Sequence, residues 1–144
     1  MTIDELKEKI KECDKLDDEI KKLKEQQENI LIELWNKKIE IAKVIKESGY
    51  LFTHPTINYT SSRGPILGLD KEENTLFVFS IGEGLLQVYL YSEKSQRTSW
   101  RKLVELGLFE EAYNGLKYLD KMIDIYIKNN KEVIEKLKNQ IKKC

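Results

Sequence analysis

The chain has 144 residues, with 25 basic and 25 acidic side chains and a formal net charge of zero. This length fits one domain, and the balanced charge makes nucleic acid an unlikely partner. No apolar run approaches the ~20 residues that a membrane-spanning helix needs. Residues 1–5 lack the basic start and apolar stretch of a signal peptide. We therefore expect a cytoplasmic protein that has no membrane partner.

The first segment, residues 1–48, predicts one long helix. Thr2 and Glu5 have the spacing of a capping box, and Gly49 stands where a left-handed C-terminal cap is expected. Since neither proline nor glycine interrupts the segment, a helix over residues 3–48 would be about 69 Å long. A helix of this length cannot be buried in so small a protein, so it needs a partner helix.

The last segment, residues 108–144, predicts a second long helix. Both helices carry an apolar seam whose members are spaced by threes and fours, as in a heptad repeat. In an antiparallel arrangement the two seams match when the paired residue numbers sum to 157. The apolar pairs are then Leu16–Ile141, Ile20–Leu137, Leu23–Ile134, Ile30–Ile127, Leu34–Ile123, Ile41–Leu116 and Val44–Tyr113. The sequence predicts an antiparallel coiled coil, within one chain or between two.

The polar and thiol positions of the seams favour the same register. It places Gln27 opposite Asn130, Lys37 opposite Asp120 and Cys13 opposite Cys144. A polar pair in a seam fixes the register at some cost in stability. The two cysteines would either stay reduced, as is usual in the cytosol, or meet as a disulfide at the end of the stalk.

A second apolar stripe widens the latter half of the first helix. Its members are Leu31, Trp35, Ile39, Ala42 and Ile45. Together with the seam it is too wide for a two-stranded coiled coil alone. It must cover the β-rich module, another chain, or both, and a homo-oligomer (a dimer or higher) is the economical solution.

Residues 49–97 predict a β-rich module. Residues 76–81 and 85–91 are rich in aromatic and β-branched side chains, and Gly82-Glu83-Gly84 forms a hairpin loop between them. Residues 66–69, followed by a polar turn, complete a three-stranded antiparallel meander.

Three shorter elements complete the prediction. Residues 50–53 and 57–60 are candidate edge strands, and residues 98–107 contain a short helix before the bend at Gly107. The predicted fold class is therefore α+β, in which a long antiparallel helical coiled coil carries a small antiparallel β meander and one short helix.

The sequence lacks the motifs of catalysis. His54 is the only histidine, and there is no Cys-x-x-Cys, His-Glu-x-x-His or Gly-x-Ser-x-Gly pattern. Gly82-x-Gly84 joins two strands and does not open a helix, so it is not a phosphate-binding loop. We expect no enzyme, no metal and no cofactor; a small enzyme acting on a phosphorylated substrate stays as a third alternative.

The arginines are the sharpest indication of a binding site. There are only three, and all lie in or beside the predicted β-rich module. The planar guanidinium suits phosphate or carboxylate, hydroxyls and a predicted helix start lie nearby, and Tyr59 or Trp100 could stack on a flat ligand. The candidate ligand-binding residues are Arg63, Arg97, Arg101, Tyr59, Ser61, Ser62, Thr98, Ser99 and Trp100.

Each of these residues also has a structural interpretation. The arginines could pair with carboxylates and brace the module, while Thr98 or Ser99 could simply cap the short helix. Trp100 could anchor the core beneath the sheet. His54, which precedes Pro55, is expected to be a surface or turn residue.

The order of long helix, β meander, the turn Arg97-Thr98-Ser99-Trp100-Arg101 and C-terminal helix resembles that of small phage proteins that block bacterial defence. Some of these, the Thoeris anti-defence proteins, form oligomers that sequester cyclic-nucleotide signals. The resemblance is one of architecture, and it implies an anti-defence function for an oligomer of this chain.

Two functions follow as expectations. The leading one is a non-enzymatic oligomeric protein that binds or sequesters an anionic, nucleotide-like ligand. The alternative is a protein-interaction module (an inhibitor, adaptor or phage structural component) that engages a partner protein through the coiled coil and the β module. A pocket lined by all three arginines would favour the first function, and an exposed apolar surface would favour the second.

Overall fold

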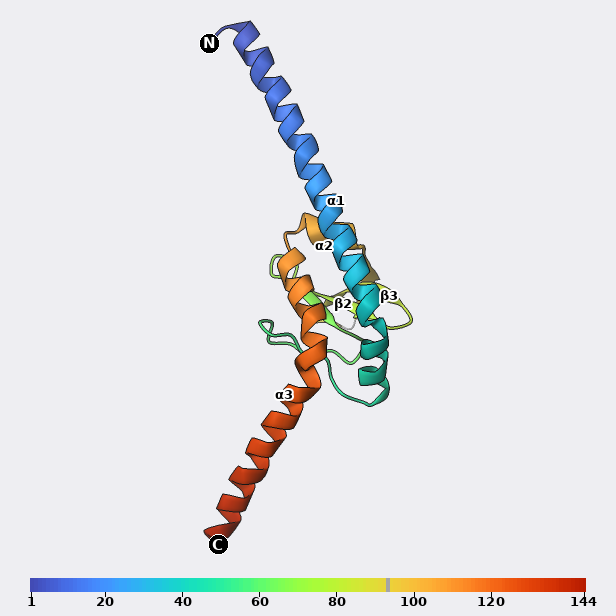
Figure 1. The fold of residues 1–144 in the computed structure, drawn as a ribbon, viewed down its shortest axis with the longest axis vertical. Coiled ribbons are helices and arrows are strands. Elements are labelled where there is room, and N and C mark those ends of the chain that lie inside the picture. The colour runs from blue at the N-terminus through green and yellow to red at the C-terminus, as the bar shows by residue number, and fades with distance from the viewer. Residues whose placement is uncertain (93) are drawn as a thin grey trace.

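The computed structural model describes residues 1–92 and 94–144, and it confirms the predicted α+β class (Figure 1). In chain order the elements are α1 (Ile3–Glu47), β1 (Ile66–Asp70), β2 (Thr75–Ser80), β3 (Gly84–Tyr89), β4 (Ser95–Arg97), α2 (Trp100–Glu105) and α3 (Phe109–Lys142). Within this described part, no helix combines the length and the apolar character that crossing a membrane would require.

The ends of α1 follow the predicted capping signals. The Thr2 hydroxyl accepts a hydrogen bond from the Glu5 amide, and the Glu5 carboxylate accepts one from the Thr2 amide, at 3.1 and 3.2 Å. Ser48 is the C-terminal cap, and Gly49 follows with φ of +81°, a conformation that glycine adopts without strain. The predicted capping box and glycine stop are confirmed.

The sheet is an antiparallel meander with the strand order β1-β2-β3-β4. The three predicted strands are present, and β4 adds a short fourth strand on the edge beside β3. The two expected edge strands before the meander are wrong as strands, because only the single bridge Phe52–Ser61 forms there. Pro55 interrupts this stretch and removes a donor that a ladder would need.

The main core lies between one face of the sheet and the two long helices. Helix α1 contributes Leu31, Leu34, Trp35, Ala42 and Ile45, and α3 contributes Ala112, Leu116, Leu119 and Met122. On the sheet these side chains meet Leu67, Phe77 and Leu85. The second apolar stripe of α1 therefore covers the β module, as one of its predicted alternatives required.

Helices α1 and α3 run side by side in the same direction (Figure 1). Two salt bridges show which parts of the helices lie side by side. Lys24 binds Glu105, just before α3, and Lys38 binds Asp120 further along both helices. At the end of α1, the Tyr50 and Tyr126 rings lie 5.3 Å apart. Strand β4 leads into α2 beside the middle of α1, so α3 starts there and continues in the direction of α1.

Of the two alternatives for the predicted antiparallel coiled coil, pairing within one chain is therefore wrong. Leu116 is fully buried against the module, so it is not available to Ile41, and Asp120 binds Lys38 instead of Lys37. The sheet and the α2 connection decide the helix direction, and a match between two heptad patterns cannot anticipate that choice. A single chain therefore has two separate helical extensions and no two-helix stalk.

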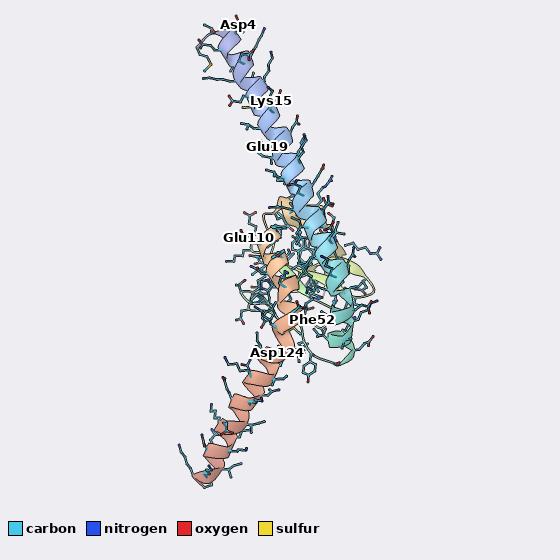
Figure 2. All side chains as sticks on the ribbon, in the orientation of Figure 1. Asp4, Lys15, Glu19, Phe52, Glu110 and Asp124 are labelled. Atoms are coloured by element: carbon cyan, nitrogen blue, oxygen red, sulfur yellow. The ribbon has the colours of Figure 1, made fainter. Side chains whose placement is uncertain are left out.

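These extensions project from opposite ends of the module (Figure 1). We call residues 3–30 the N-terminal arm and residues 127–142 the C-terminal arm. Neither contains a buried residue, and Figure 2 shows their side chains, such as those of Lys15 and Glu19, standing clear of the module. Cys13 and Cys144 are both exposed, and they lie on or beside the arms at opposite ends of the module, so the alternative in which they meet within one chain is also wrong.

Candidate functional site

The outer face of the sheet, which the long helices leave uncovered, holds the first candidate site. A small cluster of Ile57, Ile66, Leu76 and Val78 lies on this face. Beside it, a shallow depression of about 450 Å³ is lined by Thr60, Ser61, Ser62, Arg63, Leu76, Val78 and Val88. The loop that carries Arg63 therefore borders a surface with an apolar floor and a hydroxyl-bearing rim.

Two of the three arginines share this face. Arg97 lies opposite Leu86 and Ser95 lies opposite Val88 in the β3–β4 pairing, which puts both β4 side chains on the Val88 side of the sheet. The Arg63 guanidinium donates a hydrogen bond from Nη1 to Ser95 Oγ at 3.3 Å. Arg63 is half-buried and Arg97 is exposed. The two arginines thus form a cationic edge beside the depression.

The hydroxyls of the loop differ in their roles. Ser61 is buried, and its Oγ accepts hydrogen bonds from the amides of Arg63 and Gly64 at 3.2 and 3.4 Å. This turn holds the loop in shape, so Ser61 acts on Arg63 through the backbone. Ser62 and Tyr59 are exposed and free to contact a ligand.

Arg101 does not join the other two arginines. It lies in α2 and its Nε is 3.4 Å from Glu28 Oε2 of α1. The depression beside it, about 200 Å³, is lined by both signs of charge: Lys21, Lys24, Glu25, Glu28, Arg101, Val104 and Glu105. Arg101 therefore pairs with a carboxylate and braces the module, as its structural interpretation predicted.

The residues between Arg97 and Arg101 serve the fold. Ser99 is the N-terminal cap of α2, and its hydroxyl accepts from the Lys102 amide at 3.1 Å. Trp100 is half-buried and stacks on Phe79, which in turn contacts Trp35, with ring centroids 5.8 and 4.1 Å apart. The Trp100 indole thus belongs to an aromatic row between the sheet and α1.

Thr98 Oγ1 is buried and has no hydrogen-bond partner among the residues that the structure describes. The Thr98 amide continues the β3–β4 pairing by donating to the Leu85 carbonyl at 3.0 Å. Thr98 and Ser99 therefore differ in role, because only Ser99 caps the helix.

His54 is buried, so the expected surface position is wrong; it lies directly before the bend at Pro55 and Thr56. Its Nε2 donates to the Glu111 carbonyl at 2.7 Å, and its Nδ1 accepts from the amides of Thr56 and Ile57 at 3.1 and 3.2 Å. Burial lowers the pKa of the ring below its usual value, against the opposing effects of the Glu111 carbonyl and carboxylate. The neutral His54 ring therefore links its own loop to α3 through these hydrogen bonds.

The exposed seams of the two arms form the second candidate site. Every apolar side chain on the seam of either arm is about half exposed or more: Leu16, Ile20, Leu23, Ile30, Ile127, Ile134, Leu137 and Ile141. Such a continuous apolar strip on a solvated helix is typical of a contact surface. The sequence predicts that both seams pair with each other, within one chain or between two.

An apolar groove continues this surface onto the module. Between the parallel helices lies a hollow of about 490 Å³, lined by Glu40, Ile41, Val44, Ile45, Leu119, Asp120 and Ile123. Ile41 and Val44 remain 38% and 62% exposed there, although they belong to the seam of α1. The exposed apolar surface of the C-terminal arm therefore continues from Ile127 to Ile123 in this groove, whereas on α1 the buried Leu34 separates the groove from the seam of the N-terminal arm.

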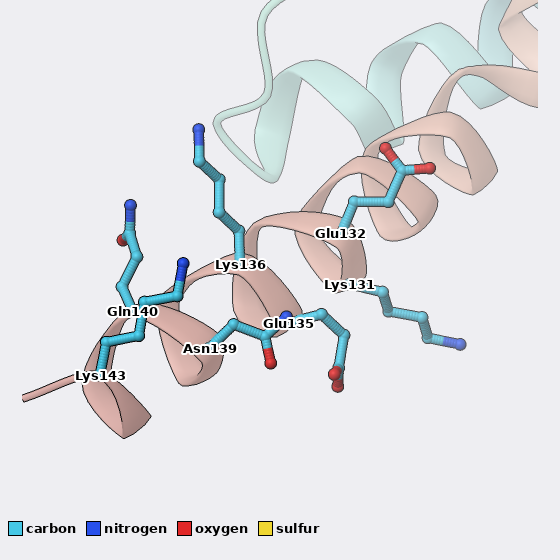
Figure 3. A pocket seen from close by; sticks show the side chains of 7 residues that line it. All are labelled: Lys131, Glu132, Glu135, Lys136, Asn139, Gln140 and Lys143. Carbon is cyan, nitrogen blue, oxygen red and sulfur yellow. The ribbon is translucent and has the colours of Figure 1, made fainter.

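The opposite side of the C-terminal arm is polar (Figure 3). A hollow of about 610 Å³ there is bordered only by side chains of α3 and its C-terminal cap: Lys131, Glu132, Glu135, Lys136, Asn139, Gln140 and Lys143. One free-standing helix cannot enclose a ligand, so this hollow is not a candidate pocket. Among residues 1–92 and 94–144, no three His, Cys, Asp or Glu side chains are grouped to hold a metal ion.

Comparisons with protein-family models, curated protein sequences and solved structures find no match to this chain.

Proposed function

We propose that this is a non-enzymatic protein that self-associates through its helical arms and presents its β module from the assembly. The observation that carries this proposal is the pair of exposed apolar seams. Leu23 on the N-terminal arm and Ile134 on the C-terminal arm are 52% and 49% exposed, and their neighbours one turn away are similar. An isolated amphipathic helix gains most of its stability from a packed partner, so these arms favour association.

Sedimentation equilibrium tests this proposal. The chain should sediment at a multiple of its 17.0 kDa mass, and a variant with Ile20→Gln and Leu23→Gln should sediment as the 17.0 kDa monomer. Lys22→Gln is the matched control, because Lys22 is exposed but lies off the seam of the same arm. A wild-type chain that stays monomeric at millimolar concentration contradicts the proposal.

A second function is favoured by the outer face of the sheet. Arg63 and Arg97 lie there without a carboxylate within salt-bridge distance in the described part of the chain, whereas Arg101 binds Glu28. Two guanidinium groups beside a hydroxyl-bearing loop suit an anionic group such as a phosphate. An oligomer that sequesters a cyclic-nucleotide signal, as the phage anti-defence resemblance implies, would use this face.

Mass spectrometry of small molecules released by denaturing the purified protein tests the second function. A recurrent nucleotide should be released from the wild type and from Arg101→Gln, and lost from the double variant Arg63→Gln with Arg97→Gln. Retention by the double variant contradicts a role for this face. If the wild type releases no small molecule, the ligand proposal is wrong and the arms alone carry the function.

A further inference from the structure

The two seams share a pattern that specifies how they can meet. Along the N-terminal arm the spacing from Leu16 is four, three, four and three residues. Along the C-terminal arm the spacing from Ile127 is three, four, three and four residues. In sequence order the positions are Leu16, Ile20, Leu23, Gln27 and Ile30, and Ile127, Asn130, Ile134, Leu137 and Ile141. Both are heptad seams with a single polar member.

Within one chain these seams cannot touch, because the arms leave the module at opposite ends (Figure 1). From the level of the Lys38–Asp120 salt bridge, Cys13 lies about 37 Å along α1 in one direction. Cys144 lies about 36 Å along α3 in the other direction. The two thiols of one chain are thus roughly 70 Å apart.

A second copy related by a two-fold axis perpendicular to the helices covers the apolar seams of both arms at once. The rotation reverses the helix direction, so the C-terminal arm of the second copy lies antiparallel along the N-terminal arm of the first. In the same way, the C-terminal arm of the first copy lies along the N-terminal arm of the second. Leu23 is 15 residues before Lys38 and Ile134 is 14 residues after Asp120, so an axis at the level of the salt bridge brings Leu23 and Ile134 together. Such an isologous contact closes at two copies.

Charge favours the mixed pairing of arms. Residues 13–30 hold six acidic and four basic side chains, whereas residues 127–144 hold two acidic and six basic side chains. The arms therefore have opposite net charge, which attracts an N-terminal arm to a C-terminal arm and disfavours the pairing of two C-terminal arms.

We propose that two copies of this chain form an antiparallel dimer in which each N-terminal arm packs along the C-terminal arm of the other copy. Leu16, Ile20, Leu23 and Ile30 meet Ile141, Leu137, Ile134 and Ile127 of the second copy, and Gln27 lies opposite Asn130. This arrangement rests on the proposed self-association and adds its partner, direction and register. The pairing stops at Ile30, because further along α1 the residues that would continue it, such as Leu34, are buried in the module.

Oxidative cross-linking of the two native cysteines tests the arrangement. In the proposed register Cys13 lies opposite Cys144 of the second copy, and a disulfide between these two positions cannot form inside one chain. Oxidation of dilute protein with copper phenanthroline should give a covalent dimer whose disulfide peptides join Cys13 to Cys144. Cys13→Ser and Cys144→Ser should each lose this product, and a mixture of the two variants should regain it.

A displaced thiol provides the control. Asp18→Cys in the Cys13→Ser background puts the thiol on the same arm but off the seam, and it should cross-link at least tenfold more slowly. A dimer whose disulfides join Cys13 to Cys13, or Cys144 to Cys144, overturns the proposed direction and leaves self-association standing. A monomer in sedimentation with no covalent dimer overturns both proposals.

Discussion

Replacing Gly115 by alanine should destabilise the protein, although it places a better helix former in α3. A Cβ atom at Gly115 would lie 2.3 Å from the Ile66 carbonyl oxygen and 2.9 Å from Cδ2 of His54. Alanine usually stabilises a helix interior by about 1 kcal/mol relative to glycine. Here α3 must move away from β1, and overpacking of this kind costs about 1–3 kcal/mol.

We expect the overlap to outweigh the propensity, because the nearest atom belongs to a strand backbone and cannot rotate away. Contact with a strand backbone puts the overlap in the upper part of that range, about 2–3 kcal/mol. After the gain of about 1 kcal/mol in helix propensity, the net loss should be about 1–2 kcal/mol, or roughly 2–8 °C in melting temperature for a chain of this size. Circular dichroism at one fixed protein concentration measures it. Asn114→Ala, at an exposed neighbouring position of α3, is the control and should melt at or slightly above the wild type. A Gly115→Ala variant as stable as the wild type would refute the close contact between α3 and β1.

Three further predictions concern the module. Because burial lowers the His54 pKa, the unfolded chain binds the proton more readily than the folded chain. The free energy of unfolding should therefore fall as the pH drops through about 6.5. In urea titrations the His54→Gln variant should be less stable than the wild type at pH 8, but its stability should depend less on acid. Trp100→Ala should lose about 2 kcal/mol through its half-buried stack, whereas Tyr91→Ala, at an 85% exposed position, should change little. Ser99→Ala should cost about 1 kcal/mol by removing the cap of α2, and Ser99→Asp should restore it; equal melting of all three chains would exclude a capping role.

Local signals in the sequence predicted local structure well. The Thr2 and Glu5 capping box, the Gly49 stop and the β meander depend on neighbours within a few residues, and all are present. The stripe through Trp35 was assigned to the β module as one of its alternatives, because its width exceeds what a two-stranded coiled coil can cover.

Long-range choices were not predictable in the same way. Two heptad seams match in an antiparallel pair whichever chains they belong to, so the pattern alone could not exclude pairing within one chain. The direction of α3 is decided by the short α2 connection, where Arg101 meets Glu28. The clustering of arginines along the sequence likewise gave no indication that Arg63 and Arg97 lie on the outer face of the sheet while Arg101 does not.

Spin labels on Cys13 and Cys144 test most directly whether the arms meet only between chains. Fully labelled protein should show strong dipolar broadening, because Cys13 lies next to Cys144 of the second copy. Mixing with an excess of unlabelled chain should remove the broadening, since the two labels of one chain are roughly 70 Å apart. Broadening that survives this dilution would mean that the arms fold against each other within one chain, and it would contradict the account.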